Sequence, residues 1–215
     1  MGTFGDEFLN VREFMARELG FFTTMPLPDE NDDLWRRFID SFIPALAAPP
    51  LNNGGYVYFP PGTYYIKRGF TIGPKLTLVI ATGAKLVLPR GGDINPALSP
   101  PFLSPDSRYN TLCVEVQGAL QAGPHQFLEP TFDEAGNHTG RGTLLLSGES
   151  VQQVYPEWWG ARSDAYPFGA AVVNSTLGLQ SAIDAAVHNR THQFGASIPI
   201  MLSGRYTLRR PVYIG

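Results

Sequence analysis

The sequence predicts a mainly β chain built as a solenoid, in which short strands stack along one axis and helices cover one end. The first observation is an internal repeat, because the twelve residues Gly62–Gly73 align without a gap with Gly204–Gly215 and are identical at five positions. Such a repeat is typical of stacked supersecondary units. The second is a change of hydrophobic period, from near 3.6 before residue 54 to 2 after it. The third is the shortness of the strand-like runs.

Three segments show helical spacing of apolar residues, at about 6–20, 33–46 and 175–188. Asp32 or Asp33 is placed to cap the second helix, and Asn174 or Ser175 the third. We interpret residues 1–53 as an N-terminal helical cap or attachment region.

Short strands with alternating apolar residues follow from residue 56, and the segment 198–214 is predicted to repeat this strand cassette. Residues 89–110 contain five prolines and are predicted to form a lateral loop. The expected divisions are a first β cassette at 54–160, which includes that loop, and a second helix with its β cassette at 161–215. Since the second copy of the repeat ends at Gly215, we expect the chain to be the N-terminal part of a longer protein.

Composition excludes several classes of function. Charged residues make up 16% of the chain and the net charge is −3, so no basic surface for nucleic acid is expected. Cys113 is the single cysteine, which excludes an internal disulfide. No signal peptide and no apolar run long enough to span a bilayer is evident.

Two phrases resemble the pectate-lyase-like superfamily of right-handed parallel β-helix proteins. One is the strand, Pro-Pro-Gly corner and strand at 54–64. The other is Pro-Glu-Trp-Trp-Gly-Ala at 156–161 with the helical phrase at 179–186. The resemblance covers about half of the chain and implies a right-handed parallel β-helix with a helical cap and a carbohydrate partner. It does not imply a reaction, because the superfamily includes lyases, glycoside hydrolases, phage tailspikes and adhesins. The chain departs from the pattern at 162–169, where an acidic loop is usual.

Candidate carbohydrate-binding residues are of two kinds. Two adjacent tryptophans offer rings for stacking on a sugar, although packing against the helix is the favoured interpretation. Two basic pairs occupy the same place in both copies of the repeat and could line an anionic groove, or simply keep a β surface soluble. The residues are Trp158, Trp159, Lys67, Arg68, Arg209 and Arg210.

The first helical segment is more apolar than a free tail, which suggests either a cap over the first strands or an element that attaches to a sister subunit or a larger particle. The residues concerned are Phe8, Met15, Leu19, Phe21 and Phe22.

No catalytic residue, metal site or cofactor is predicted. Glycoside hydrolysis needs two carboxylates across a sugar site, and the acidic residues here are scattered or lie at helix starts. His188 and His192 are four residues apart, but a third metal ligand at usable spacing is missing.

The sequence therefore predicts the N-terminal part of a β-helical tailspike or fibre-like surface protein, mainly structural, that attaches to or recognises polysaccharide. The alternative is the cap region of a polysaccharide-degrading enzyme, a lyase or a glycoside hydrolase, whose active site lies beyond residue 215 or in the proline-rich loop. A homotrimer is the expected assembly, and the surface of a virion, another particle or a cell is the expected location.

Overall fold

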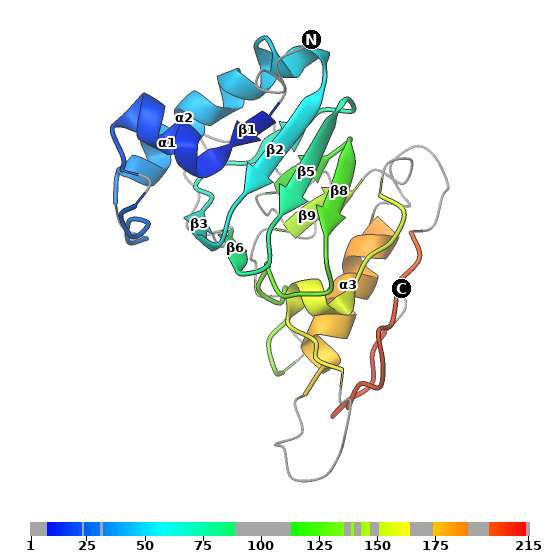
Figure 1. Cartoon of the computed structure of the whole chain (residues 1–215). Helices are drawn as coiled ribbons and strands as arrows, with labels where there is room; N and C mark the ends of the chain where they lie inside the picture. The colour runs from blue at the N-terminus through cyan, green and yellow to red at the C-terminus, as the bar shows by residue number, and fades with distance from the viewer. Residues whose placement is uncertain are drawn as a thin grey trace.

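A computed structural model of the chain describes residues 8–22, 24–30, 32–88, 113–135, 139, 143–146, 151–163, 174–188 and 198–213. The predicted proline-rich loop at 89–110 lies outside the described residues. Within them the chain forms three α-helices and nine short strands (Figure 1). The helices are α1 (Val11–Leu19), α2 (Leu34–Ala47) and α3 (Thr176–His188).

The strands belong to three small sheets, and every pairing between them is parallel. The four-stranded sheet has the order β1 (Phe8–Asn10), β2 (Gly55–Phe59), β5 (Leu76–Ile80) and β8 (Ala119–Ala122). The two-stranded sheet pairs β3 (Gly62–Tyr65) with β6 (Ala84–Val87). The three-stranded sheet has the order β4 (Phe70–Ile72), β7 (Cys113–Val116) and β9 (Thr143–Leu146).

The predicted fold class, a mainly β right-handed parallel β-helix with capping helices, is wrong. The described residues form an α/β mix of short parallel strands in three small sheets together with three helices. Helices and strands take similar shares of these residues, and α2 and α3 are each longer than any strand. Strand period and repetition indicate a solenoid, but the helical segments contribute as much regular structure as the strands.

The two copies of the repeat also fold differently. The first copy forms β3 and β4, which pair with β6 and β7. The second copy, as far as it is described, forms no strand and makes a single parallel bridge from Thr207 to Asn174. Just before it, Ile200 makes a similar bridge to Val154. The predicted strand cassette at 198–214 is therefore wrong for its described part.

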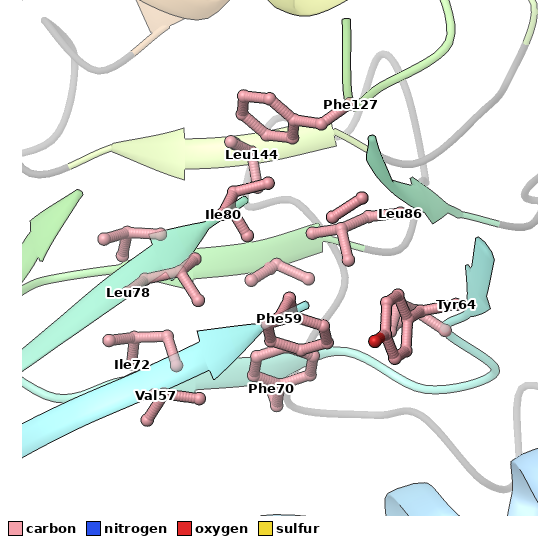
Figure 2. Packing of buried hydrophobic residues seen from close by; sticks show 14 of the residues in the cluster. Val57, Phe59, Tyr64, Phe70, Ile72, Leu78, Ile80, Leu86, Phe127 and Leu144 are labelled. Atoms are coloured by element: carbon pink, nitrogen blue, oxygen red, sulfur yellow. The ribbon is translucent and has the colours of Figure 1, made fainter. Parts of the chain in front are cut away.

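The hydrophobic core lies between the three sheets, where alternate side chains of successive strands meet (Figure 2). In β2, Val57 and Phe59 are fully buried, whereas Tyr56, which points to the opposite face, is 46% exposed. This confirms the period of 2 that the sequence shows. The labelled residues that fill the core are Val57, Phe59, Tyr64, Phe70, Ile72, Leu78, Ile80, Leu86, Phe127 and Leu144.

Helices α1 and α2 lie beside the β1 and β2 end of the four-stranded sheet (Figure 1). Phe42 of α2 reaches the core, with its ring centroid 6.1 Å from that of Phe59 and 5.3 Å from that of Phe70. Phe14 of α1 packs on the same ring at 6.0 Å. The apolar stripe of α2 that the sequence shows therefore closes one end of the core.

Side-chain hydrogen bonds to backbone N–H groups mark the N-terminus of each helix. The Asn10 side chain accepts hydrogen bonds from the backbone N–H groups of Arg12 and Glu13, which caps α1. At α2 the Asp32 carboxylate accepts from the Leu34 N–H at 2.8 Å, and at α3 the Asn174 side chain accepts from the Thr176 N–H at 3.1 Å. The sequence indicates two candidate capping residues for α2 and two for α3. In each case one of the two, Asp32 or Asn174, accepts the hydrogen bond.

No helix in the described part of the chain is long and apolar enough to cross a membrane. The predicted division at residues 1–53, 54–160 and 161–215 stays a prediction.

Candidate functional site

The candidate site is built around a 3-10 turn at Pro156–Trp159, the phrase that the sequence singled out. Its backbone is anchored to the loop after β8, because the Trp158 carbonyl accepts from the N–H groups of Phe127 and Leu128, at 3.2 and 2.8 Å. The turn ends at Gly160, whose φ of +84° is a left-handed conformation that favours glycine. This anchoring fixes the direction of each side chain in the turn, including that of the acidic residue Glu157.

Glu157 is the chemically distinctive residue of the turn, because its carboxylate is buried and only 7% of the residue is exposed. Its Oε1 accepts hydrogen bonds from the hydroxyls of Ser203 and Tyr206, which come from the C-terminal segment. Its Oε2 is buried and has no hydrogen-bond partner among the described residues. An unpaired buried carboxylate oxygen lowers the stability of the fold, because it has lost its hydrogen bonds to water.

A cavity of about 490 Å³ opens beside this carboxylate. Three segments that are distant in sequence form its wall: the loop after β8, the end of the 3-10 turn, and the C-terminal segment. The lining residues are Pro124, His125, Gln126, Glu157, Gly160, Ala161, Arg162, Ser163 and Ser203.

His125 supplies a second polar atom without a partner in this wall. Its Nε2 is buried and makes no hydrogen bond within the described part of the chain. The ring is held from one side by Phe127, at a centroid separation of 6.0 Å. Two residues of the cavity wall, Glu157 and His125, thus each keep one polar atom buried and without a hydrogen-bond partner in the described part of the chain.

The hydroxyl groups at Glu157 are themselves ordered. The Tyr206 oxygen accepts from the Ser203 backbone N–H at 3.0 Å, and the two hydroxyl oxygens lie 3.1 Å apart. Burial raises the pKa of Tyr206 above its ordinary value, and the hydrogen bond that it donates to Glu157 raises the pKa further. Tyr206 therefore stays a neutral donor toward the carboxylate at neutral pH.

Arg162 lies at the outer part of the wall, and its side chain is exposed. Its backbone is fixed, because its N–H donates to the Ser175 hydroxyl at 3.0 Å and its carbonyl accepts from the same hydroxyl at 2.9 Å. The site combines a buried negative group with a solvated positive group. Within the described residues, no cluster of three or more His, Cys, Asp or Glu is placed to hold a metal ion.

The two predicted stacking residues are both buried. Trp158 and Trp159 are each 1% exposed, and the Trp158 ring packs on Phe127 at a centroid distance of 5.3 Å. Its Nε1 donates to the Gly123 carbonyl at 3.1 Å. This burial favours the packing interpretation, since a buried ring has no open face for a sugar.

The basic pair Lys67 and Arg68 lies beside the α2 region. Lys67 Nζ is 3.7 Å from a carboxylate oxygen of Glu30, and Arg68 Nη1 is 3.6 Å from one of Asp40. Both pairs are partly exposed, so they contribute little stability.

The second basic pair, Arg209 and Arg210, lies in the C-terminal segment that runs along α3 (Figure 1). The Arg210 guanidinium donates to the backbone carbonyls of Asp133 and Glu134, each at 2.6 Å. Arg209 is exposed, and its backbone N–H donates to the Thr176 hydroxyl at 3.0 Å. The two basic pairs therefore face different neighbours, and the structure does not bring them together in one groove.

The predicted attachment residues divide into two groups. Met15 and Phe21 are buried in the core, and Leu19 is partly buried against it. Phe8 is 49% exposed and Phe22 is 66% exposed. The first group supports the cap interpretation, whereas Phe8 and Phe22 remain available for an attachment role.

The phrase that contains Glu157 is evident in the sequence, where its tryptophans are the predicted binding residues. No sequence pattern indicates His125, Ser203, Arg162 or Ser163. One signal was present: Glu157 is an acidic residue within the otherwise uncharged run Tyr155–Ala161. The contacts with Ser203 and Tyr206 span more than 40 residues, and no spacing rule predicts them.

Comparison of the chain with family models, with curated proteins and with solved structures found no match. The resemblance to the pectate-lyase-like superfamily therefore stays a prediction.

Proposed function

We propose that this chain is a structural part of a fibre- or tailspike-like surface protein that recognises polysaccharide, and that the cavity beside Glu157 holds one sugar unit. The observation that carries the proposal is the polar lining of that cavity, to which Glu157, Ser163 and Ser203 contribute. The cavity volume of about 490 Å³ falls within the usual range for small-molecule sites, roughly 300–1,000 Å³.

The polar groups of the wall suit a polyhydroxylated ligand. Each sugar hydroxyl donates one hydrogen bond and accepts others, and the wall offers a carboxylate acceptor at Glu157 and hydroxyl groups at Ser163 and Ser203. His125 and Gln126 add further polar side chains to the same wall. A sugar unit would exchange hydrogen bonds with the hydroxyl groups of Ser163 and Ser203, which favours binding.

The alternative function, degradation of a polysaccharide, has less support. Both common mechanisms of glycoside hydrolysis use two carboxyl groups that flank the scissile bond. Among the described residues that line the cavity, Glu157 is the only acidic one. Recognition requires only the complementary polar groups that the wall already has.

A glycan array probed with the whole chain, followed by calorimetric titration of the best glycan, tests the proposal. Glu157→Gln keeps the side-chain shape but converts part of the carboxylate acceptor into a donor, so the affinity should fall at least tenfold. The matched control is Glu18→Gln, which changes an exposed glutamate of α1 paired with Arg17 and should leave the affinity unchanged.

Thermal unfolding of each variant separates loss of binding from loss of folding. If Glu157→Gln does not fold, His125→Leu removes the other unpaired polar atom of the wall and should weaken binding in the same way. An array with no bound glycan, or a glycan affinity that both cavity variants leave intact, would contradict the proposal.

A further inference from the structure

The outer face of the four-stranded sheet carries aromatic side chains and no charged ones. Val57 and Phe59 of β2 point into the core, so the alternating side chains of Tyr56 and Tyr58 point outward. In Figure 1 strand β9 lies behind this sheet, and no described helix lies in front of β2, β5 and β8. The register places two rows of outward residues across the strands, namely Phe8, Tyr56, Thr77 and Ala119, and Asn10, Tyr58, Val79 and Gln121.

The outward positions of the other two sheets include charged residues. Lys85 of β6 lies between two buried neighbours, points outward and pairs with Glu129 at 2.9 Å. Glu115 of β7 also lies between two buried residues and accepts from the Thr71 hydroxyl at 3.1 Å. Among the sheets that the structure describes, an uncharged outer face is therefore particular to the four-stranded one.

Packing within the molecule does not account for Tyr56. It is 46% exposed, and its ring and its hydroxyl have no aromatic or hydrogen-bond partner among the described residues. By contrast, the Tyr58 ring packs on Phe8 at a centroid distance of 5.7 Å, and such cross-strand aromatic pairs stabilise a sheet. An exposed ring without such a partner gains little from burial. Tyr56 is thus the ring of this face that is available to a ligand.

A groove continues this face past β1. Its volume is about 410 Å³, which falls within the usual range for small-molecule sites. Phe8 and Asn10 belong both to the outer face and to the lining of the groove. The charged residues of the lining, Glu13 and Arg17, are opposite in sign, so the groove adds no net charge to the face.

Resting on the proposed recognition of polysaccharide, we propose that the outer face and the groove form a second sugar-binding surface, which takes a neutral polysaccharide. One sugar unit stacks on the Tyr56 ring, and an adjoining unit of the same chain enters the groove beside Phe8. A pyranose ring has a face of C–H groups and a rim of hydroxyls, which suits an aromatic ring flanked by uncharged polar side chains. Thr77 neighbours Tyr56 in the register, and its hydroxyl donates and accepts hydrogen bonds.

The size of the outer face favours a sugar over a second protein chain. Four strands about 4.8 Å apart, with three to five residues each at about 3.3 Å per residue, present a face of roughly 200 Å². A stable protein interface buries about 800 Å² on each partner, which is several times more. A sugar needs only a ring to stack on and hydrogen-bonding groups beside it.

The lack of charge on this face determines the class of polysaccharide. Acidic polysaccharides are bound by Arg or Lys side chains that pair with their carboxylates. The outward residues of the four strands include neither Arg nor Lys, so a carboxylate on this face would have no positive partner there. The hydroxyls of a neutral sugar find suitable partners in Thr77 and Gln121, which both donate and accept hydrogen bonds.

The test titrates linear trisaccharides into the isotopically labelled whole chain, while NMR follows the amide signals of the outer face and those of the Glu157 cavity as two separate groups. The probes are cellotriose, maltotriose and mannotriose, which are neutral, and trigalacturonate, which is acidic. The expected result is that one neutral trisaccharide shifts the signals of Tyr56 and Thr77 and binds there at least about threefold more tightly than trigalacturonate.

Three variants show whether the Tyr56 ring is responsible. Tyr56→Ser removes the ring and should weaken binding at the outer face about tenfold, whereas Tyr56→Phe keeps the ring and should bind within about twofold of the wild type. The matched control is Tyr213→Ser, which removes a ring that is 74% exposed in the C-terminal segment and should leave the affinity unchanged. Thermal unfolding shows whether each variant folds. If Tyr56→Ser does not fold, Phe8→Ser removes the ring shared with the groove and should weaken binding in the same way.

The outcomes separate this inference from the sugar site at Glu157. Shifts confined to the cavity, tightest binding of trigalacturonate at the outer face, or equal affinity of wild type and Tyr56→Ser would overturn the inference while the cavity site stands. Outer-face signals that change on dilution but not with sugar would identify a second copy as the occupant and overturn it as well. Shifts confined to the outer face would overturn the cavity site alone, and absence of shifts at both places with every trisaccharide would overturn both.

Discussion

Tyr64 shows how a single polar side chain is accommodated inside the core. Its ring is fully buried between Trp35 and Phe59, and its hydroxyl donates to the Pro60 carbonyl at 2.9 Å. Burial raises the pKa of the Tyr64 phenol well above its ordinary value, although the nearby positive charge of Arg12 lowers the pKa in part. The folded chain therefore holds this proton more tightly than the unfolded chain does.

This shift predicts a loss of stability in alkali. The contribution of Tyr64 is fully present below about pH 10, the ordinary pKa of tyrosine, and is lost as the pH rises from there through the raised pKa. Tyr64→Phe cannot ionise, so its free energy of unfolding should fall less steeply above pH 10 than that of the wild type. At pH 7 the variant should be about 1 kcal/mol less stable because the bond to Pro60 is lost.

Urea unfolding at pH values from 7 to 11 measures both effects. A pH dependence of Tyr64→Phe that matches the wild type above pH 10 would show that Tyr64 does not ionise differently in the folded chain.

For single residues, the sequence predicts which side chains are buried better than it predicts which side chains contact one another. The inward positions of the strands follow from their period of 2, and Val57, Phe59 and Phe70 are all fully buried. The role of Glu157 was not predictable, because it depends on hydroxyls from residues 203 and 206 that fold back on the turn. The burial of both tryptophans follows from the same long-range packing.

Helix α3 packs very closely on the 3-10 turn that forms the site. A Cβ added at Gly178 of α3 would lie 2.5 Å from the backbone N of Ala161 and 2.8 Å from its Cβ. Ala161 also lines the cavity beside Glu157. The small residue in the helix thus sets the position of one wall of the site.

Gly178→Ala should destabilise the chain and disturb the cavity. Overpacking costs about 1–3 kcal/mol, which outweighs the gain of up to about 1 kcal/mol when alanine replaces glycine in a helix. We expect a net loss of about 1–2 kcal/mol in the free energy of unfolding, together with weaker binding of the sugar.

The matched control is Gly73→Ala, because a Cβ at Gly73 meets no atom within 4 Å. It should change the stability by less than about 0.5 kcal/mol. Chemical denaturation of both variants checks this, and equal stabilities would mean that α3 does not pack against the turn as described.

Elements with strong local signals were predicted with good boundaries. Helix α2 runs over Leu34–Ala47, within a residue of the predicted 33–46, and α3 starts next to its predicted cap. Helix α1 begins at Val11 rather than near residue 6, because Asn10 provides the cap. The second copy of the repeat failed as a prediction, since similar residues form a strand only where a partner strand is available.

For the whole molecule, the parallel pairing of short strands was expected and is observed in every named sheet. The fold class was wrong, because the helical segments account for as much regular structure as the strands. Local period identifies each element, but the assembly of elements depends on contacts between distant segments. Phe42 of α2 on Phe59 and Phe70 is such a contact.

Self-association is a prediction at this scale. Phe8 and Phe22 are exposed, as is Met25 at 50%, which leaves these apolar side chains available to a partner. We propose a homotrimer, which light scattering or native mass measurement of the whole chain would detect as three times 23.6 kDa. Phe22→Ser should shift the population toward monomer, and a wild-type mass equal to one chain would contradict the proposal.

The most direct test of the sugar site is a crystal structure of the chain with the sugar that binds best in solution. The sugar should occupy the cavity, with its hydroxyl groups within hydrogen-bond distance of Ser163 and Ser203. A sugar bound only at another surface, or a cavity that holds only water beside Glu157 while the sugar is bound, would contradict the account.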